Sequence, residues 1–314
     1  DSGTVYALNA DTGCEYWTVK AGNGVRTAPA LGLIGDQWRV FFGDRGARVY
    51  SVDALSGQAL WTTKVDDHAA AILTGSPQFL HLDNVASPDR LLVPVSSSEE
   101  GIAAVPTYVC CTFRGSLISL DATTGDVLWQ SHTIASPPVA QGDRQFGPSG
   151  GAIWSAPTID LVNQRLFVTT GDAYSSLADI GTDAVISMDL LTGQIRWINQ
   201  GTADDIWTVV CMTPNASEAC GPDQDYGSPG MLLDSQGVRV LVAAQKSGIV
   251  RAFSLQGGTV LWQTALVENT TEFGGKVVWG GASDNQRAYF GLGTGGIAAV
   301  NLASSAIDWF TPLS

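Results

Sequence analysis

The sequence is poor in basic side chains. Its 314 residues include 16 Lys and Arg against 30 Asp and Glu, which gives a formal net charge of −14. Nucleic acids and anionic membrane surfaces bind basic faces, so neither class of partner is expected. The acidity fits an extracytoplasmic protein that holds a cation, although acidity that serves solubility alone is the alternative.

Metal-ligand and haem-attachment motifs are missing as well. The three histidines, His68, His81 and His132, are scattered, and the chain has no His-x-Glu or Cys-x-x-Cys pattern. A zinc enzyme or a histidine-based triad is therefore not expected. Cys-x-x-Cys-His, the attachment motif of c-type haem, is also absent.

Long apolar runs and helical periods are absent too. No stretch reaches the roughly 18 apolar residues that a membrane span needs. There is neither an initiator Met nor a signal peptide, so we expect a processed or partial chain. What is present is a high content of glycine, aromatic and β-branched residues, which predicts an all-β protein.

A hairpin unit recurs along the chain. In its clearest copy, 116–120 is a strand, Asp121 to Gly125 is a turn, and a return strand reaches Trp129. The successive copies end 44, 68, 68, 65 and 47 residues apart, against about 40 to 50 for a four-stranded propeller blade. We therefore predict a β-propeller over 1–314, with hairpins that end near Trp17, Trp61, Trp129, Trp197, Trp262 and Trp309.

The predicted ring is open. Residues 1–17 begin in the middle of a blade, so the six hairpins come with only five complete pairs of first and second strands. The chain is thus expected to be a portion of a larger ring or to be completed by a partner chain, with a closed six-blade ring as the alternative. Long loops around 96–111, 147–181 and 204–230 predict the binding face.

Paired cysteines and sequons favour an oxidising compartment, so a secreted, periplasmic or extracellular location is expected. Cys211 and Cys220 flank a loop and predict a disulfide. Asn215, inside this loop, and Asn269 are glycosylation sequons. Cys14 has no evident partner.

Two adjacent cysteines, Cys110 and Cys111, lie in the first long loop. An exposed vicinal pair in an oxidising compartment is expected to be a disulfide, and such flat, strained rings occur chiefly at functional sites. The alternative is one buried and one surface thiol.

Several single residues are candidates for a site. Trp154 follows a glycine run outside the repeat register, so its indole can present a face to a flat ligand, with blade packing as the alternative. Carboxylates are suitable calcium ligands or general bases, and a lysine at the start of a strand can bind an anionic ligand. For each of these residues the alternative is an ordinary turn or surface side chain. The candidates are Asp172, Glu99 and Glu100 for the cation, Asp179 and Asp183 for the base, and Lys246.

The loops resemble the pyrroloquinoline-quinone (PQQ)-dependent alcohol dehydrogenase family, in its polyvinyl alcohol dehydrogenase-like branch. The matching stretches run nearly end to end. They include Pro94-Val-Ser-Ser-Ser-Glu-Glu, Cys110-Cys-Thr-Phe-Arg-Gly, Ile153-Trp-Ser-Ala-Pro-Thr-Ile-Asp, Thr170-Gly-Asp-Ala-Tyr-Ser, Thr182-Asp-Ala-Val, Gly221-Pro-Asp-Gln-Asp-Tyr-Gly-Ser-Pro, Gln245-Lys-Ser-Gly and Gly274-Gly-Lys-Val-Val-Trp-Gly.

The resemblance implies an eight-bladed propeller, of which about six blades are visible, with PQQ between an indole and a vicinal disulfide and calcium beside it. It assigns the indole to Trp154 and the opposite plate to Cys110-Cys111. It further implies Asp172 with Glu99 or Glu100 as calcium ligands, Asp183 or else Asp179 as the general base, and Lys246, Arg114 and Trp279 around the cofactor.

The implied function is oxidation of a small or polymeric alcohol, a secondary alcohol among the candidates. A carboxylate takes the alcohol proton, calcium polarises the quinone, and hydride passes to the cofactor. With no haem domain, the electron acceptor is expected to be an external, cytochrome c-like protein. The alternative is a non-catalytic propeller in an extracellular binding or assembly role, and a weaker one is an outer-membrane assembly scaffold.

Overall fold

The computed structural model describes residues 2–82, 88–177, 179–214, 216, 219–235, 237–268 and 276–313. Both sequon asparagines, Asn215 and Asn269, lie outside the described residues. Among the described residues no helix is long and apolar enough to cross a membrane.

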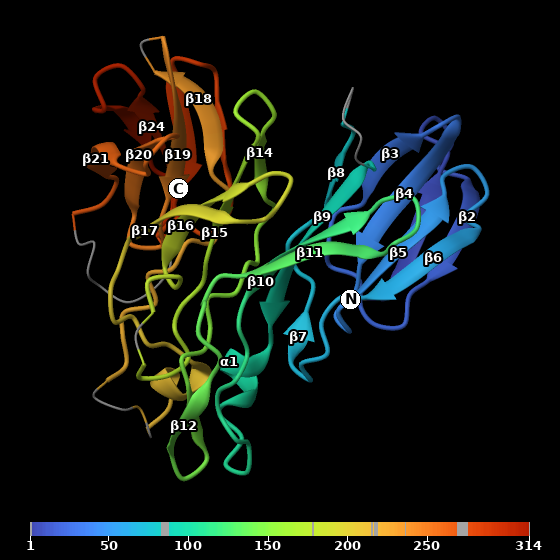
Figure 1. Ribbon diagram of the computed structural model, residues 1–314. Helices are drawn as coiled ribbons and strands as arrows, with labels where there is room; N and C mark the ends of the chain where they lie inside the picture. Colours follow the sequence, from blue (N-terminus) through green and yellow to red (C-terminus); the bar gives the residue numbers. More distant parts are fainter. Residues whose placement is uncertain are drawn as a thin grey trace.

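The chain folds into successive antiparallel sheets, as the repeat predicts (Figure 1). The first sheet has two strands, β1 (Thr4–Leu8) and β2 (Glu15–Lys20). The second has four: β3 (Ala30–Ile34), β4 (Gln37–Gly43), β5 (Arg48–Asp53) and β6 (Ala59–Lys64). In the third, β7 (Ala71–Ile72) and β8 (Gln78–Leu80) both pair with β9 (Arg90–Ser97), followed by β10 (Ser116–Asp121) and β11 (Val127–His132).

Three further four-stranded sheets complete the described fold. They are β14 (Thr158–Asp160), β15 (Arg165–Thr169), β16 (Ala184–Asp189) and β17 (Ile195–Gln200); β18 (Met231–Ser235), β19 (Val238–Ala244), β20 (Ile249–Ser254) and β21 (Val260–Ala265); and β22 (Gly281–Ser283), β23 (Arg287–Gly291), β24 (Ile297–Asn301) and β25 (Ile307–Thr311). In the described part of the chain, the first and last sheets do not pair. This confirms a propeller of six visible blades, one of them half formed, in an open ring.

Alternation along the inner strands builds the core. Neighbouring residues of one strand point to opposite faces, so each sheet packs against the sheet before it and the sheet after it. Leu91 of β9 contributes to the cluster shared with the second sheet, whereas Leu92 contributes to the cluster shared with the fourth. Phe41 and Phe42 of β4 divide in the same way. The core is therefore five separate interfaces between six blades.

The repeat tryptophan connects each blade to the next. The indole Nε1 of Trp197 donates to the carbonyl of Leu255 in the following turn, at 3.1 Å. A Cβ added to Gly258 of that turn would lie 2.4 Å from the indole, and Gly258 also has a φ of +67°. The glycine thus serves both the turn and the close approach of the indole. The same docking pairs Trp17 with Gly57, Trp61 with Gly125 and Trp129 with Gly193.

The long loops lie between the blades and carry a short helix α1 (Glu99–Ile102), a hairpin of β12 (Val139–Gly142) and β13 (Gln145–Gly147), and a 3-10 turn η1 (Val209–Met212). Single β-bridges join them in series from Arg114 to Gly150, Ala173, Ile206 and Cys220. Figure 1 shows this loop region around α1 and β12, on one side of the blades. Loops distant in sequence are therefore held as one layer.

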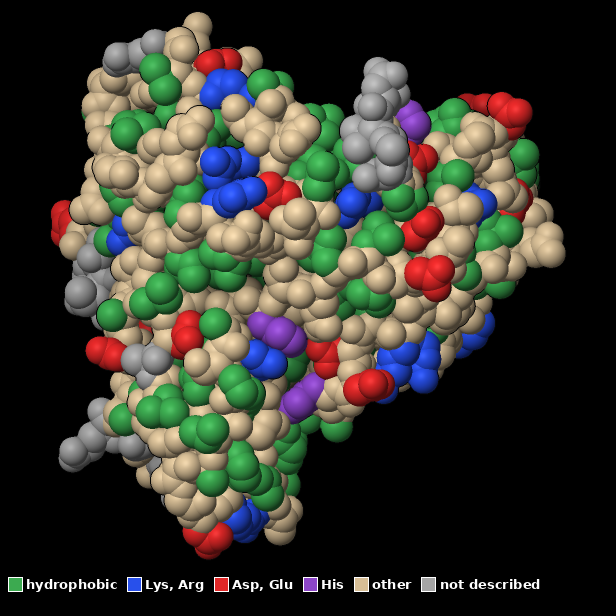
Figure 2. Space-filling model, in the orientation of Figure 1, with side chains coloured by type: hydrophobic (Ala, Val, Ile, Leu, Met, Phe, Trp, Pro, Cys, Tyr) green, Lys and Arg blue, Asp and Glu red, His purple; other side chains and the backbone are tan. Residues whose placement is uncertain are grey.

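Charged side chains are dispersed on the face that Figure 2 shows, with basic groups in small separate patches among acidic and neutral ones. This face offers no continuous basic stripe of the kind that binds a nucleic acid backbone.

We expect Trp197→Ala to lower the free energy of unfolding by about 3–5 kcal/mol, as for other buried aromatic truncations. The reason is that Trp197 is 8% exposed and packs against Phe167 and Phe253. Trp309→Ala is the matched control, because its indole is 42% exposed and no hairpin follows it in the described chain. Urea denaturation followed by circular dichroism would measure both; equal losses would contradict blade-to-blade docking.

Candidate functional site

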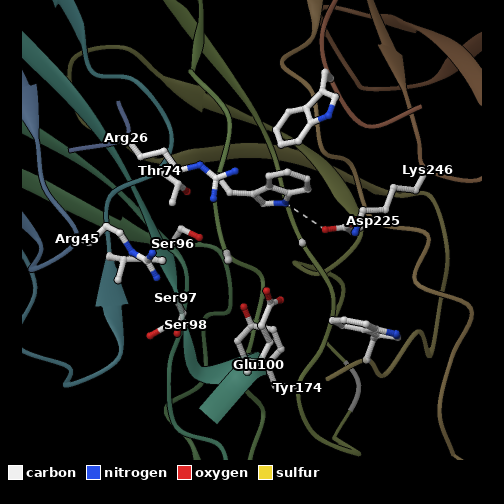
Figure 3. Close-up of a pocket in the computed structure, with 17 residues that line it drawn as sticks. Arg26, Arg45, Thr74, Ser96, Ser97, Ser98, Glu100, Tyr174, Asp225 and Lys246 are labelled. Carbon is white, nitrogen blue, oxygen red and sulfur yellow. Dashed lines mark hydrogen bonds and ion pairs between the residues drawn. The ribbon is translucent and has the colours of Figure 1, made fainter. Parts of the chain in front are cut away.

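A cavity of about 390 Å³ opens where the long loops meet the inner strands. Figure 3 shows Arg26 and Arg45 on one side, Asp225 and Lys246 on the other, and Glu100 and Tyr174 below. The wall also includes three tryptophans and a run of serines at the end of β9: Trp154, Trp207, Trp279 and Ser96 to Ser98.

Trp154 is held in this wall by contacts with a carboxylate, Asp225, and an ammonium group, Lys246. Its Nε1 donates to Asp225 Oδ2 at 3.1 Å, and the Lys246 ammonium lies 5.3 Å from the centre of its ring. Lys246 Nζ in turn lies 2.6 Å from Asp223 Oδ1 and 2.7 Å from Asp225 Oδ1. Trp279 crosses the indole edge-on, with ring centres 6.0 Å apart. Gly227 leaves room for the indole, because a Cβ added there would lie 2.6 Å from the Trp154 ring.

Burial dominates the electrostatics of this group. Burial lowers the pKa of Lys246, but the attraction of Asp225, Asp172 and Asp223 outweighs it, so the net pKa is raised. For Asp225, burial raises the pKa more than Lys246 and Trp154 lower it. Asp223 reaches a pKa of about 6 for the same reasons. Lys246 is therefore a permanent cation, and the acids beside it are more basic than ordinary aspartates.

Asp172 belongs to two groups of buried carboxyls. One group joins it to Asp223 and Asp225, the other to Asp183 and Asp205, with one oxygen from each residue and all three within 4.8 Å. Burial, followed by repulsion from Asp225 and Asp183, raises the pKa of Asp172. One oxygen of Asp172 has no hydrogen-bond partner. These are features of a site that accepts a cation.

The two glutamates of α1 have different surroundings. Glu100 lines the cavity, and burial followed by repulsion from Asp225 raises its pKa to about 7. Glu99 is fully buried and accepts from the Tyr108 hydroxyl at 2.8 Å and from the backbone N–H groups of Thr112 and Phe113 at 2.9 and 2.8 Å. Of the two predicted metal ligands, Glu100 faces the cavity, whereas Glu99 holds the loop that carries the adjacent cysteines.

Cys110 and Cys111 form a disulfide, and so do Cys211 and Cys220. Cys14 is free and exposed. Neither Cys110 nor Cys111 is among the residues that line the cavity, and Cys111 is fully buried in the cluster between the second and third blades. The stacking role expected of this pair stays a prediction.

The other predicted residues lie apart from the cavity wall. Arg114 donates to the carbonyls of Ile134 and Ala135, at 3.1 and 3.2 Å. Asp183 is fully buried in the inner carboxyl group, whereas Asp179 lines a separate small cavity. The structure thus brings together Trp154, Lys246, Glu100 and Trp279, with Asp172 immediately beside them, and separates Arg114 and Asp179 from them.

Sequence reasoning missed three residues of the wall, Asp225, Arg26 and Arg45, and also Asp223, which pairs with Lys246 beside it. A signal was present for the acids, since Asp223-Gln-Asp225 lies in the long loop after 204. For the arginines the signal was weaker. Arg26 stands alone before the first strand of the second blade, and Arg45 stands alone between its second and third strands. Only the meeting of blades brings them to the same cavity.

A family model described as outer membrane protein assembly factor BamB matches residues 1–200 and 97–314. The polyvinylalcohol dehydrogenase of Pseudomonas sp is 36% identical, over 99% of this chain and 50% of the relative. That of Sphingopyxis sp. (strain 113P3) is 33% identical, over 98% of this chain and 50% of the relative. The chain spans about half the length of the curated relatives it matches.

Solved structures agree on the fold. The crystal structure of a quinohemoprotein alcohol dehydrogenase from Comamonas testosteroni superposes with a TM-score of 0.71 at 15% identity, over 99% of this chain and 58% of that one. BamB from Moraxella catarrhalis superposes with a TM-score of 0.59 at 14% identity, over 99% of this chain and 67% of that one.

We predict that Glu100 exchanges a proton near neutral pH in chelator-treated protein. Its pKa of about 7, against an ordinary 4.5, means that the folded state binds this proton more tightly than the unfolded chain. The resulting stability is fully present below pH 4.5 and is lost as the pH rises to about 7. Glu100→Gln should therefore raise the free energy of unfolding at pH 8 by on the order of 3 kcal/mol and leave it unchanged near pH 4.

Urea denaturation at the two pH values would measure this difference. Glu99→Gln is the control. The Glu99 carboxylate accepts hydrogen bonds through both of its oxygens, whereas a glutamine amide has only one acceptor oxygen, so this variant should lose stability at pH 8. An effect of Glu100→Gln that is the same at both pH values would contradict the prediction.

Proposed function

The chain belongs to the PQQ-dependent alcohol dehydrogenase family, and on this premise we propose that it forms the cofactor cavity of a PQQ- and calcium-dependent alcohol dehydrogenase. One observation carries the proposal: the indole of Trp154 lies in a cavity wall against an ion pair, donating to the buried Asp225 carboxylate while the Lys246 ammonium that pairs with Asp225 lies 5.3 Å from its ring. A propeller that only binds or assembles has no need of this combination.

The cavity suits a flat, anionic cofactor. Its volume of about 390 Å³ falls in the range of small-ligand sites. The Trp154 ring supplies a face for stacking, and Lys246, Arg26 and Arg45 supply positive charge for carboxylate and quinone oxygens. On this proposal Cys110-Cys111 would bound the opposite side, Arg114 would act from outside the wall, and Trp279 would line the mouth.

The acids suit a hard divalent cation beside the cofactor. Asp172, Asp223 and Asp225 bring three carboxylate oxygens within 4.8 Å of one another, and Glu100 adds a fourth carboxyl at the cavity. Calcium prefers such oxygen ligands. Lys246 leaves part of this negative charge unbalanced, which favours a cation of higher charge.

The residues of the chain would bind, orient and deprotonate the alcohol. Asp225 is the candidate base, because it lines the cavity and burial raises its pKa toward the working range of a base. Lys246, paired with Asp225, would keep the carboxylate in position. When bound, the quinone supplies the hydride acceptor. Asp183 and Asp179 remain alternatives for the base, although neither lines the main cavity.

Substrate, partners and location follow from the family by analogy. The relatives named polyvinylalcohol dehydrogenase favour a polymeric or secondary alcohol, and Trp279, which is 65% exposed at the cavity, offers such a substrate an aromatic surface. We further propose an external, cytochrome c-like electron acceptor, a secreted or periplasmic location, and completion of the open ring by further blades or a partner chain.

We expect Trp154→Ala to weaken PQQ binding by about 10-fold or more in the presence of calcium, because stacked aromatic contacts contribute about 1 kcal/mol or more beyond buried area. Titration of PQQ followed by its absorbance would measure the loss. Trp279→Ala is the matched control, with a smaller effect on PQQ and a larger one on the KM of the alcohol. Failure of the wild-type protein to bind PQQ with calcium would favour the assembly role instead.

We expect Asp225→Asn to lower kcat for dye-linked alcohol oxidation by about 10²–10⁴-fold, the contribution typical of a general base, while PQQ remains bound. Because this base must be ionised, wild-type kcat should fall as the pH drops through the raised pKa of Asp225. Asp183→Asn and Asp179→Asn decide between the alternatives: the true base is the residue whose variant keeps the cofactor, loses turnover and abolishes the acid limb of the pH profile.

A further inference from the structure

Three buried carboxyl groups lie together outside the set of residues that line the cofactor cavity. Asp172, Asp183 and Asp205 each bring one oxygen to within 4.8 Å of the other two, and none is more than 2% exposed. They come from separate segments: Asp172 follows β15, Asp183 directly precedes β16, and Asp205 lies in the loop after β17. We call these three residues the inner acid cluster.

The protein does not satisfy this cluster by itself. Both carboxylate oxygens of Asp183 and one of Asp172 have no hydrogen-bond partner, although they are buried. Thr182 and the Asp172 carboxyl lie beside Asp183, but the Thr182 hydroxyl donates to the Asp179 carbonyl at 3.1 Å, and Asp205 and Asp225 repel the Asp183 carboxylate. Asp205, in contrast, accepts from the backbone N–H groups of Asp223 and Gln224 at 3.1 and 2.7 Å. A buried carboxylate without donors is costly, so the oxygens of Asp183 point to a missing partner.

A second, small cavity lies next to the chain neighbours of the cluster. It measures about 10 Å³, and its lining includes Ala173, Thr182, Asp204 and Ile206, which are the chain neighbours of the three aspartates. Asp179 also lines it. The space is of the order that one small ion or one water molecule needs. None of the three aspartates lines this cavity, whose own acids are Asp179 and Asp204.

We propose that Asp172, Asp183 and Asp205 bind a second divalent cation of the calcium class, behind the cofactor cavity. All of its protein ligands are oxygens, as calcium prefers. Asp172 belongs both to this cluster and to the group with Asp223 and Asp225 at the cavity, so its carboxyl group joins the two sites. The inner ion contacts no lining residue of the cofactor cavity and goes beyond the proposed function.

The inner ion ties three segments that position the active site. Asp172 follows Gly171 of the cavity wall, and Asp205 holds the backbone of Asp223 and Gln224, next to Asp225. A cation between Asp172, Asp183 and Asp205 removes the repulsion among them and fixes the loop that carries Asp225. The predicted role is therefore structural, and it requires neither PQQ nor substrate.

The test is calcium binding by the intact, chelator-stripped protein without PQQ, measured by equilibrium dialysis with radioactive calcium. Wild-type protein should bind a calcium ion. The Asp183→Asn variant should lose this ion or bind it about 100-fold more weakly, because calcium affinity depends on the charge of the ligands. Asp223→Asn, in the outer group, is the matched control and should retain it. Calcium should raise the Tm of wild type and of Asp223→Asn but not of Asp183→Asn.

Two results would overturn the proposal. The first is that wild-type protein binds no calcium without PQQ. The second is that Asp183→Asn binds calcium with unchanged number and affinity, which would mean that Asp172 and Asp183 share a proton instead. If Asp183→Asn does not fold, Asp205→Asn serves as the second variant, and the wild-type measurement still decides. Loss of PQQ binding with an intact inner ion would contradict the proposed function alone, so the two failures are distinguishable.

Discussion

The site depends on the burial of several carboxyl groups around one ammonium group. Lys246 pairs with Asp223 and Asp225, and the indole of Trp154 donates to Asp225 with the ammonium 5.3 Å from its ring. Breaking a buried pair leaves an uncompensated charge and typically costs 3–5 kcal/mol. These residues come from different blades and loops, so the charge requirement fixes the blades relative to one another at the cavity.

Burial, with repulsion among neighbouring carboxylates, shifts the pKa values of the acids around Lys246. Burial is the leading cause of the raised pKa of Asp172, Asp183, Asp205, Asp223 and Asp225. A protein keeps such groups together when a cation, a proton or a reaction needs them. The cavity cation, the general base and the inner ion proposed here all depend on these buried carboxyl groups. The two cations need carboxylate ligands, and the general base needs a carboxylate with a raised pKa.

The propeller supplies rigidity for this arrangement in a modular way. The inner strands give alternate residues to two interfaces, and four of the repeat tryptophans, Trp17, Trp61, Trp129 and Trp197, dock on the turn glycine of the next blade. Insertions can then lengthen the loops without disturbing the sheets. The bridges from Arg114 through Gly150, Ala173 and Ile206 to Cys220 join those loops into one layer, so a site made of loop residues still has a firm base.

The sequence by itself determined the blades, because a strand–turn–strand unit closed by Asp, Gly and Trp is a local pattern. It also proposed Trp154, which lies outside the repeat register, and Lys246, at the start of a strand, and both line the cavity. It could not decide between Glu99 and Glu100, since adjacent residues of a short helix point in different directions and only packing tells which faces the cavity. Nor could it single out Asp225: its role arises from contacts with Trp154 and Lys246, and such long-range contacts exist only once the blades have packed.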